Sequence, residues 1–160
     1  MLWPRCPPAA PAFDPAAAAA AYWERFVQPP PPSPLRVAPG EMLVGLEAFL
    51  EIGGDPSPTW SLANPIGPAV IITAEPRYVV SWGDGTSTRT SSQGVPHPGG
   101  PGEITHTYQD AGTPTITVRA YWRATWALAD GSNRGTLAEL PLPTTASLDL
   151  PVREVQAVIR

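Results

Sequence analysis

The stretch TPTITVRAYWRATWALA, residues 113–129, decides the fold class of this chain. Polar and apolar residues alternate along it, and a period of two places successive side chains on opposite faces of a β-strand. The apolar face, which we expect to be buried, consists of Ile116, Val118, Ala120 and Trp122. The polar face consists of Thr115, Thr117, Arg119 and Tyr121. The length of the stretch predicts a bend or bulge near Arg123, after which Trp126 and Leu128 continue inward.

Further strands are predicted where shorter alternating or β-branched runs lie between turn-rich residues, at 42–52, 69–74, 77–82 and 103–108. Glu75 and Pro76 separate the second run from the third. Residues 129–135 (ADGSNRG) have the composition of a hairpin turn, and Pro151 favours an edge strand or a strand switch near the end. About seven strands within 41–160, without an internal repeat, predict an all-β protein built as a single β-sandwich.

The composition agrees with a turn-rich β protein and argues against several partner classes. Charged residues make up 15% of the 160 residues, whereas there are 23 prolines and 14 glycines. All ten basic residues are arginines, and the net charge is −4. An acidic chain without a cluster of cations does not suit nucleic acid or a polybasic membrane contact. No apolar run approaches the roughly 18 residues of a membrane span.

Export and disulfide formation are also constrained by the sequence. The single cysteine, Cys6, excludes an internal disulfide. No signal peptide is visible in the sequence as written.

Residues 1–40 form a Pro/Ala-rich arm that differs from the remainder of the chain. Asp14 is a suitable N-cap, Pro15 suits the first helical position, and six alanines follow, so we expect a short helix near 15–28. The helix presents an aromatic and apolar stripe made of Tyr22, Trp23, Phe26 and Val27. A helix of this length is marginal alone in water, so we expect the stripe to dock on its own domain, on a partner or on a neighbouring subunit. The PPPPSP run after it is expected to be a stiff spacer.

The turn at WGDGT, residues 82–86, has two possible interpretations. A phosphate cradle requires a glycine-rich loop that opens a helix, usually with Gly-Lys-Ser/Thr, but this chain has no lysine and strand-forming Thr and Ser follow. The alternative is a hairpin turn. Gly83 and Gly85 permit positive φ around Asp84, whose carboxylate can accept from neighbouring backbone N–H groups. We expect the hairpin.

Two linked motifs resemble the polycystic-kidney-disease (PKD) domain. Trp82-Gly83-Asp84-Gly85-Thr86 is followed about twenty residues later by His106-Thr107-Tyr108 and the Ala111-Gly112 turn, as in that family. The resemblance is strongest over 69–122, and the whole of 41–160 is similar to exported actinobacterial proteins with a PKD-like domain. The chain departs from the pattern at Ser81, where the family usually has an acidic residue, and it lacks the cysteine pair of those relatives.

The resemblance implies an immunoglobulin-like sandwich on an extracellular or cell-surface protein, acting as a spacer, adhesion or binding module. In that fold Trp82, Gly83, Asp84, Gly85, His106 and Tyr108 have structural roles in the core and at the turn. Fold resemblance alone does not assign a site.

No constellation in the sequence indicates catalysis. A triad of His106, Asp84 and a serine would need an exposed nucleophile, and no Gly-x-Ser-x-Gly elbow is present. We therefore expect a protein that is not an enzyme and has no bound cofactor. Calcium is the ion that the turns at Asp84, Asp110 and Asp130 would suit, although solvated turns explain the same residues, and we assign no metal ligands.

These observations favour a non-catalytic structural or protein-interaction module at the cell surface, which could assemble with copies of itself through the N-terminal arm. The second hypothesis is a carbohydrate-binding module that recognises a polysaccharide of the cell envelope. Its surface would consist of exposed aromatic and arginine side chains, for which the candidates are Trp60, Arg119, Tyr121, Arg123 and Trp126.

Overall fold

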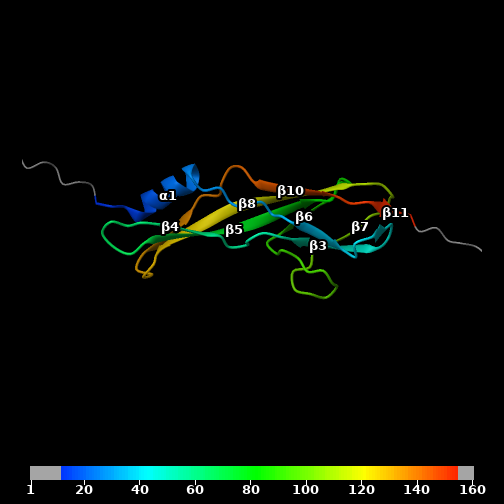
Figure 1. Ribbon diagram of the computed structural model, residues 1–160, viewed down its shortest axis with the longest axis horizontal. Helices are drawn as coiled ribbons and strands as arrows, with labels where there is room; N and C mark the ends of the chain where they lie inside the picture. The colour runs from blue at the N-terminus through cyan, green and yellow to red at the C-terminus, as the bar shows by residue number, and fades with distance from the viewer. Residues whose placement is uncertain (1–11, 155–160) are drawn as a thin grey trace, which may run out of the picture.

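The computed structural model describes residues 12–154 and shows an elongated, mostly β protein with one helix (Figure 1). Two antiparallel strands, β5 (Val70–Ser81) and β8 (Thr115–Leu128), run along most of its length. They pair without interruption from Val70↔Leu128 to Ser81↔Thr117. Cys6 lies outside the described residues.

Each long strand carries two short strands on its outer edge, which completes a six-stranded sheet. On β5 these are β4 (Thr59–Leu62) and β6 (Ser87–Thr90). On β8 they are β9 (Arg134–Leu137) and β10 (Thr144–Asp149). The β5–β8 ribbon therefore joins two halves, one with β4 and β9 and one with β6 and β10.

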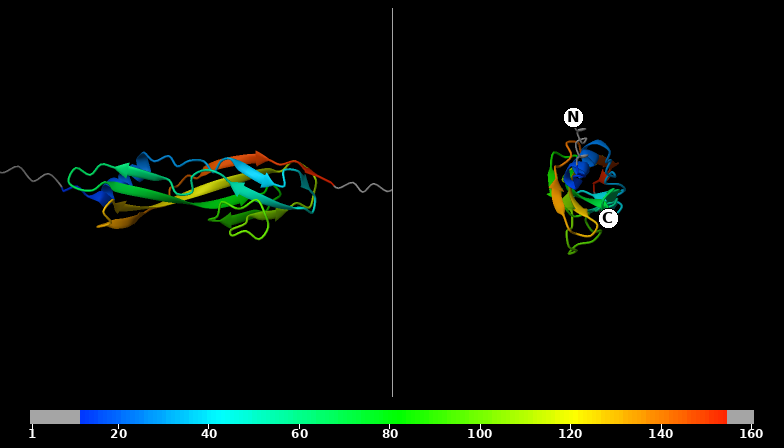
Figure 2. Two further views of the ribbon diagram at one scale, coloured as in Figure 1. Left: turned by 60° about the horizontal axis from the view of Figure 1, so that its bottom comes forward. Right: turned by 90° about the vertical axis from the view of Figure 1, so that its left-hand side faces the viewer.

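Different elements cover the two halves. A three-stranded sheet of β1 (Leu35–Ala38), β3 (Glu47–Ile52) and β7 (Thr105–Thr107) lies at the β6/β10 end. Helix α1 (Pro15–Arg25) lies at the β4/β9 end and contacts β5, β8 and β9 (Figures 1 and 2). A parallel pair of two-residue strands, β2 (Met42–Leu43) and β11 (Val152–Arg153), lies beyond the three-stranded sheet. The predicted all-β sandwich is confirmed as a β-rich, sandwich-like architecture.

The core follows the predicted alternation of residues 113–129. Ile116, Val118, Ala120 and Trp122 are buried, and Trp82 is completely buried with them. The expected bulge near Arg123 is wrong. The pairing register of β8 with β5 is unbroken, and Trp122, Trp126 and Leu128 are separated by even numbers of residues, so they lie on one face without any bulge.

Two predicted runs, 69–74 and 77–82, form the single strand β5, which passes through Pro76. Proline cannot donate a ladder hydrogen bond, so it is tolerated only where its nitrogen lacks a partner strand. The N–H of Ala74 points toward the β4 side of the strand, to Pro58 O, and position 76 points the same way. The nitrogen of Pro76 therefore faces the gap between β4 and β6, because β4 pairs with residues 70–73 of β5 and β6 pairs with residues 78–81.

The helix begins as predicted but ends three residues early. Asp14 Oδ1 accepts from the N–H groups of Ala16 and Ala17, at 3.0 and 3.4 Å. The helix ends at Arg25 with Phe26 as its C-cap. The proline run that begins at Pro29 prevents the helix from passing Gln28, because the residue before a proline is disfavoured in the helical region.

Residues of the expected arm pack closely against the remainder of the chain. Leu35–Ala38 form β1, which pairs with β3. Trp23 is 1% exposed, and its indole Nε1 donates to Ala138 O at 2.7 Å. The proline run is also attached, because Pro30 O accepts from Thr144 Oγ1 at 3.0 Å.

Candidate functional site

The Gly-Asp-Gly turn is the hairpin between β5 and β6. Asp84 Oδ1 accepts from the N–H of Thr86 at 3.1 Å and from its hydroxyl at 2.5 Å, and Trp82 N donates to Thr86 O. Gly83 has φ of +84°, and a Cβ there would approach Thr115 O within 2.7 Å. Only glycine satisfies both requirements, so this turn has a structural explanation.

His106 connects the turn to the core. Its Nε2 lies 2.6 Å from Asp84 Oδ2. Its ring stacks on Trp82 at 4.8 Å between centroids and meets the edge of Tyr108 at 4.7 Å. The Tyr108 hydroxyl in turn donates to Trp82 O at 2.8 Å. These contacts make the motif residues one packed unit that joins β5, β6 and β7.

Two pKa values are shifted in this unit. Partial burial by itself would raise the pKa of Asp84, but the hydrogen bonds from Thr86 and His106 outweigh it and hold that pKa below its ordinary value. Burial, with a smaller contribution from the charge of Asp84, raises the pKa of Tyr108 to about 12. The carboxylate form of Asp84 is therefore stabilised in the folded chain.

The geometry of this unit differs from that of a catalytic triad. A triad histidine contacts its acid through one ring nitrogen and the nucleophile through the other. Here a single nitrogen, His106 Nε2, faces both Asp84 at 2.6 Å and Thr86 Oγ1 at 3.5 Å. The Thr86 hydroxyl is itself hydrogen-bonded to Asp84. The histidine is thus placed to hold the turn.

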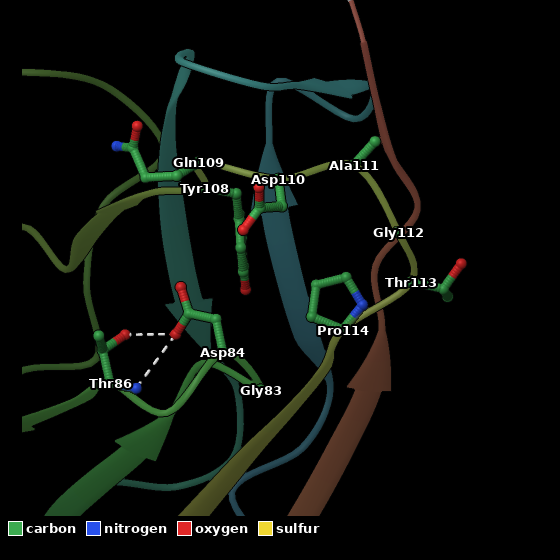
Figure 3. Close-up of a pocket in the computed structure, with 10 residues that line it drawn as sticks. All are labelled: Gly83, Asp84, Thr86, Tyr108, Gln109, Asp110, Ala111, Gly112, Thr113 and Pro114. Atoms are coloured by element: carbon green, nitrogen blue, oxygen red, sulfur yellow. Dashed lines mark hydrogen bonds between the residues drawn. The ribbon is translucent and has the colours of Figure 1, made fainter.

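A hollow of about 530 Å³ adjoins the turn (Figure 3). The side chains of Asp84 and Asp110 both border it, and residues 111–114 close one side. Of the three turn residues considered for calcium, Asp130 lies instead after the other end of β8. Within residues 12–154, no three His, Cys, Asp or Glu side chains come close enough together to hold a metal ion.

The other candidate surface is the face of the six-stranded sheet that points away from the core. We call it the outer face. It consists of the odd-numbered residues of β4, β5, β6, β8 and β10, together with Arg134 and Thr136 of β9. The alternating burial of these strands confirms that the intervening residues face inward.

The outer face has a charge opposite to that of the whole chain. It carries half of the ten basic residues, namely Arg77, Arg89, Arg119, Arg123 and Arg134. Of the 14 acidic residues, Glu75 and Asp149 belong to it, and the carboxylate of Glu139 pairs with its Arg77. A chain with a net charge of −4 thus presents a cationic sheet face.

Hydroxyl groups border the arginines on both sides in continuous rows across four strands. One row consists of Thr59, Thr73, Thr125 and Thr136. The other consists of Ser87, Ser81, Thr117 and Ser147, and in it the last two hydroxyls lie 3.3 Å apart. Between the two rows lies the arginine band, formed by Arg77, Arg89, Arg119 and Arg123.

One arginine of the arginine band, Arg77, is held in place by other side chains. Arg77 stacks over the ring of Tyr121, 5.1 Å from its centroid, and pairs with Glu139 at 3.2 Å. Within the described part of the chain, it is the only arginine of the outer face with a carboxylate within 4 Å. Arg89, Arg119 and Arg123 are exposed. Arg89 and Arg119 both lie opposite Val79, whereas Arg123 lies directly opposite Glu75 in the pairing of β5 with β8.

Two hollows lie along the threonine row. One, of about 300 Å³, is lined by Glu75, Arg123 and the threonines at 73, 125 and 136 among others. The next, of about 370 Å³, shares Thr125 and Thr136 and extends to Arg134. The outer face therefore offers hydroxyls and guanidinium groups around hollowed surface.

The structure brings only part of the expected aromatic and arginine surface together. Arg119, Tyr121 and Arg123 lie on the outer face. Trp60 and Trp126 do not, because their positions face inward. Trp60 packs against Trp23 with ring centroids 5.9 Å apart, and Trp126 is 5% exposed.

The predicted helical stripe is also divided. Trp23 is buried, Tyr22 and Val27 are half-buried, and Phe26 is 70% exposed. Tyr22 and Phe26 contact each other, with ring centroids 5.7 Å apart. The stripe thus docks on its own sheet chiefly through Trp23.

Sequence reasoning missed Arg77, Arg89 and Arg134 as members of this surface. They belong to three different strands, and only the pairing register places them beside Arg119 and Arg123. Arg77 does lie at a polar position of the run 77–82, which is the one signal in the sequence, whereas Arg89 lies in an all-polar stretch.

No protein-family model, curated protein or solved structure matches this chain. In residues 12–154 no helix combines the length and apolar character that a bilayer crossing requires. The site must accordingly be interpreted from its own residues.

Proposed function

We propose that this chain is a non-catalytic interaction module of the PKD type, an immunoglobulin-like sandwich of an extracellular or cell-surface protein that binds its partner through the outer face. The turn motif supports the family assignment, since Trp82, His106 and Tyr108 pack as one unit around the Gly-Asp-Gly hairpin. The same unit supports a structural role for Asp84 and His106.

The cationic outer face is the observation that carries the binding role. Threonine has high β-propensity, so strand formation alone accounts for the threonines. It does not account for half of the basic residues gathering on one face, where they outnumber the carboxylates of Glu75, Glu139 and Asp149. Assembly through residues 1–40 is not part of this proposal, since Trp23 is already buried in its own chain.

A carbohydrate-binding role is the second candidate. The hydroxyl rows favour it, because each threonine or serine hydroxyl can both donate to and accept from a sugar hydroxyl. Stacking on a row of aromatic rings is disfavoured, because Trp60 and Trp126 face the core.

A binding screen of the full-length protein tests the proposal, using immobilised extracellular polysaccharides and matrix proteins. The wild type is compared with Arg119→Ala/Arg123→Ala and with the control Arg36→Ala/Arg153→Ala, which removes the same charge from exposed positions off the outer face. Saturable binding that only the first variant loses supports the proposal. Absence of binding, or equal binding by all three proteins, contradicts it.

A further inference from the structure

We infer that the outer face binds an acidic polysaccharide, a polymer of carboxylate-bearing sugars laid across the arginine band and the threonine row. This inference rests on the proposed function and specifies its partner. It is carried by three features that coincide on one surface: exposed arginines, rows of hydroxyls and hollows that run along one of those rows.

The arginines select the charge of the ligand. Arg89, Arg119 and Arg123 are exposed and have no carboxylate within 4 Å among the described residues. A guanidinium group matches the two oxygens of a carboxylate with two parallel N–H donors. Since the chain as a whole is acidic, a polyanion is repelled elsewhere and held at this face.

The spacing of the arginines favours a polymer. Arg119 and Arg123 are four residues apart on β8, about 13 Å along the strand, and Arg89 is two strands away from Arg119, about 10 Å across the sheet. At these distances a small anion can contact only one of the three arginines. An extended chain with repeated acidic groups reaches several at once.

The hydroxyls favour a sugar over an acidic protein. The core of a protein interface is enriched in aromatic and other apolar side chains. On the outer face the main aromatic ring, Tyr121, is covered by Arg77. Thr125 and Thr136 instead pair across β8 and β9 and line both hollows. Paired hydroxyls that donate and accept suit sugar hydroxyls.

The test measures binding of the full-length protein to four polymers: polygalacturonate, dextran sulfate, uncharged dextran and polyglutamate. Polygalacturonate should bind most tightly, and added salt should weaken this binding because it screens the charges. Arg119→Ala/Arg123→Ala should weaken this binding about tenfold, and Arg36→Ala/Arg153→Ala should leave it unchanged. Circular dichroism and a urea midpoint establish that each variant is folded.

A second variant isolates sugar recognition from charge. Thr125→Val/Thr136→Val keeps shape and net charge but removes the paired hydroxyls. The affinity for polygalacturonate should fall about fivefold, and the affinity for polyglutamate should stay unchanged. Equal binding of polyglutamate and polygalacturonate, or no effect of this variant, would overturn the inference.

The remaining outcomes separate this inference from the proposed function. If dextran sulfate or dextran binds best and the arginine variant loses it, the module binds a sugar polymer but the carboxylate assignment is wrong. A salt-sensitive dimer abolished by Arg119→Ala/Arg123→Ala would make a second copy the occupant, which also overturns the inference. If no polymer and no matrix protein binds, the proposed function itself fails.

Discussion

At the scale of single residues, the Tyr108 hydroxyl is the buried polar link between β7 and the Gly-Asp-Gly turn. Tyr108→Phe removes its hydrogen bond to Trp82 O and leaves that carbonyl without this partner in a buried site. We expect a loss of about 1–2 kcal/mol in the free energy of unfolding, measured with urea. Tyr121→Phe is the matched control and should change stability little, because no hydrogen bond of the Tyr121 hydroxyl is present in residues 12–154.

Asp84 makes the stability of the turn depend on pH. A carboxyl whose pKa is lower in the folded chain stabilises the fold above its unfolded pKa, and this contribution disappears as the pH falls through the folded value. Asp84→Asn should therefore be less stable than the wild type at pH 7. The difference in stability between the two proteins should shrink once the pH drops below 3.8, the ordinary pKa of an aspartate. Urea midpoints of both proteins at neutral and acidic pH measure this, and a gap independent of pH would contradict it.

At the scale of elements, helix α1 replaces a second sheet over the β4/β9 half, and Trp23 provides most of its attachment. Trp23→Ala removes a buried indole and its bond to Ala138 O, so we expect about 3–5 kcal/mol of destabilisation. Phe26→Ala in the same segment should have a small effect, because Phe26 is 70% exposed. Chemical denaturation measures both. Similar losses in the two variants would mean that the helix docks in another way.

The strands show which features of the fold can be predicted from the local sequence pattern. Alternation alone predicted which residues of β8 are buried, because burial on a strand repeats every second residue. The same reasoning divided β5 at Pro76, since it could not know that the missing N–H faces a gap between two partner strands. The helix end was placed late because the proline run fixes only the last position that can be helical, Gln28, and does not account for the end at Arg25.

The candidate site was predictable only in part, because local spacing can be read from the sequence and pairing between distant strands cannot. Arg119, Tyr121 and Arg123 belong to one strand, and their shared face follows from spacing. Arg77, Arg89 and Arg134 join them through pairings between distant parts of the chain. Trp60 was misplaced because its burial depends on Trp23, which arrives from a helix 37 residues earlier in the sequence.

At the scale of the whole molecule, the β5–β8 ribbon makes the two halves one cooperative unit. Its hydrogen-bonded register passes without a break from the helix-covered half into the sandwich half. Neither half can unfold without releasing strands that the other half needs, so we expect a single two-state transition. Trp23→Ala in one half and Ile116→Ala in the other, each of which removes a buried side chain, should both shift that same transition.

The measurement compares tryptophan fluorescence with far-ultraviolet circular dichroism during urea unfolding. The two signals should coincide in the wild type and in both variants, and the slope of free energy against urea should stay constant while the midpoint falls. Fluorescence reports on both halves even in Trp23→Ala, because Trp60 and Trp126 lie in the β4/β9 half and Trp82 directly follows the other end of β5. Two separated transitions in Trp23→Ala would show that the helix-covered half unfolds alone, and the outer face would then have to be treated as two surfaces that move independently.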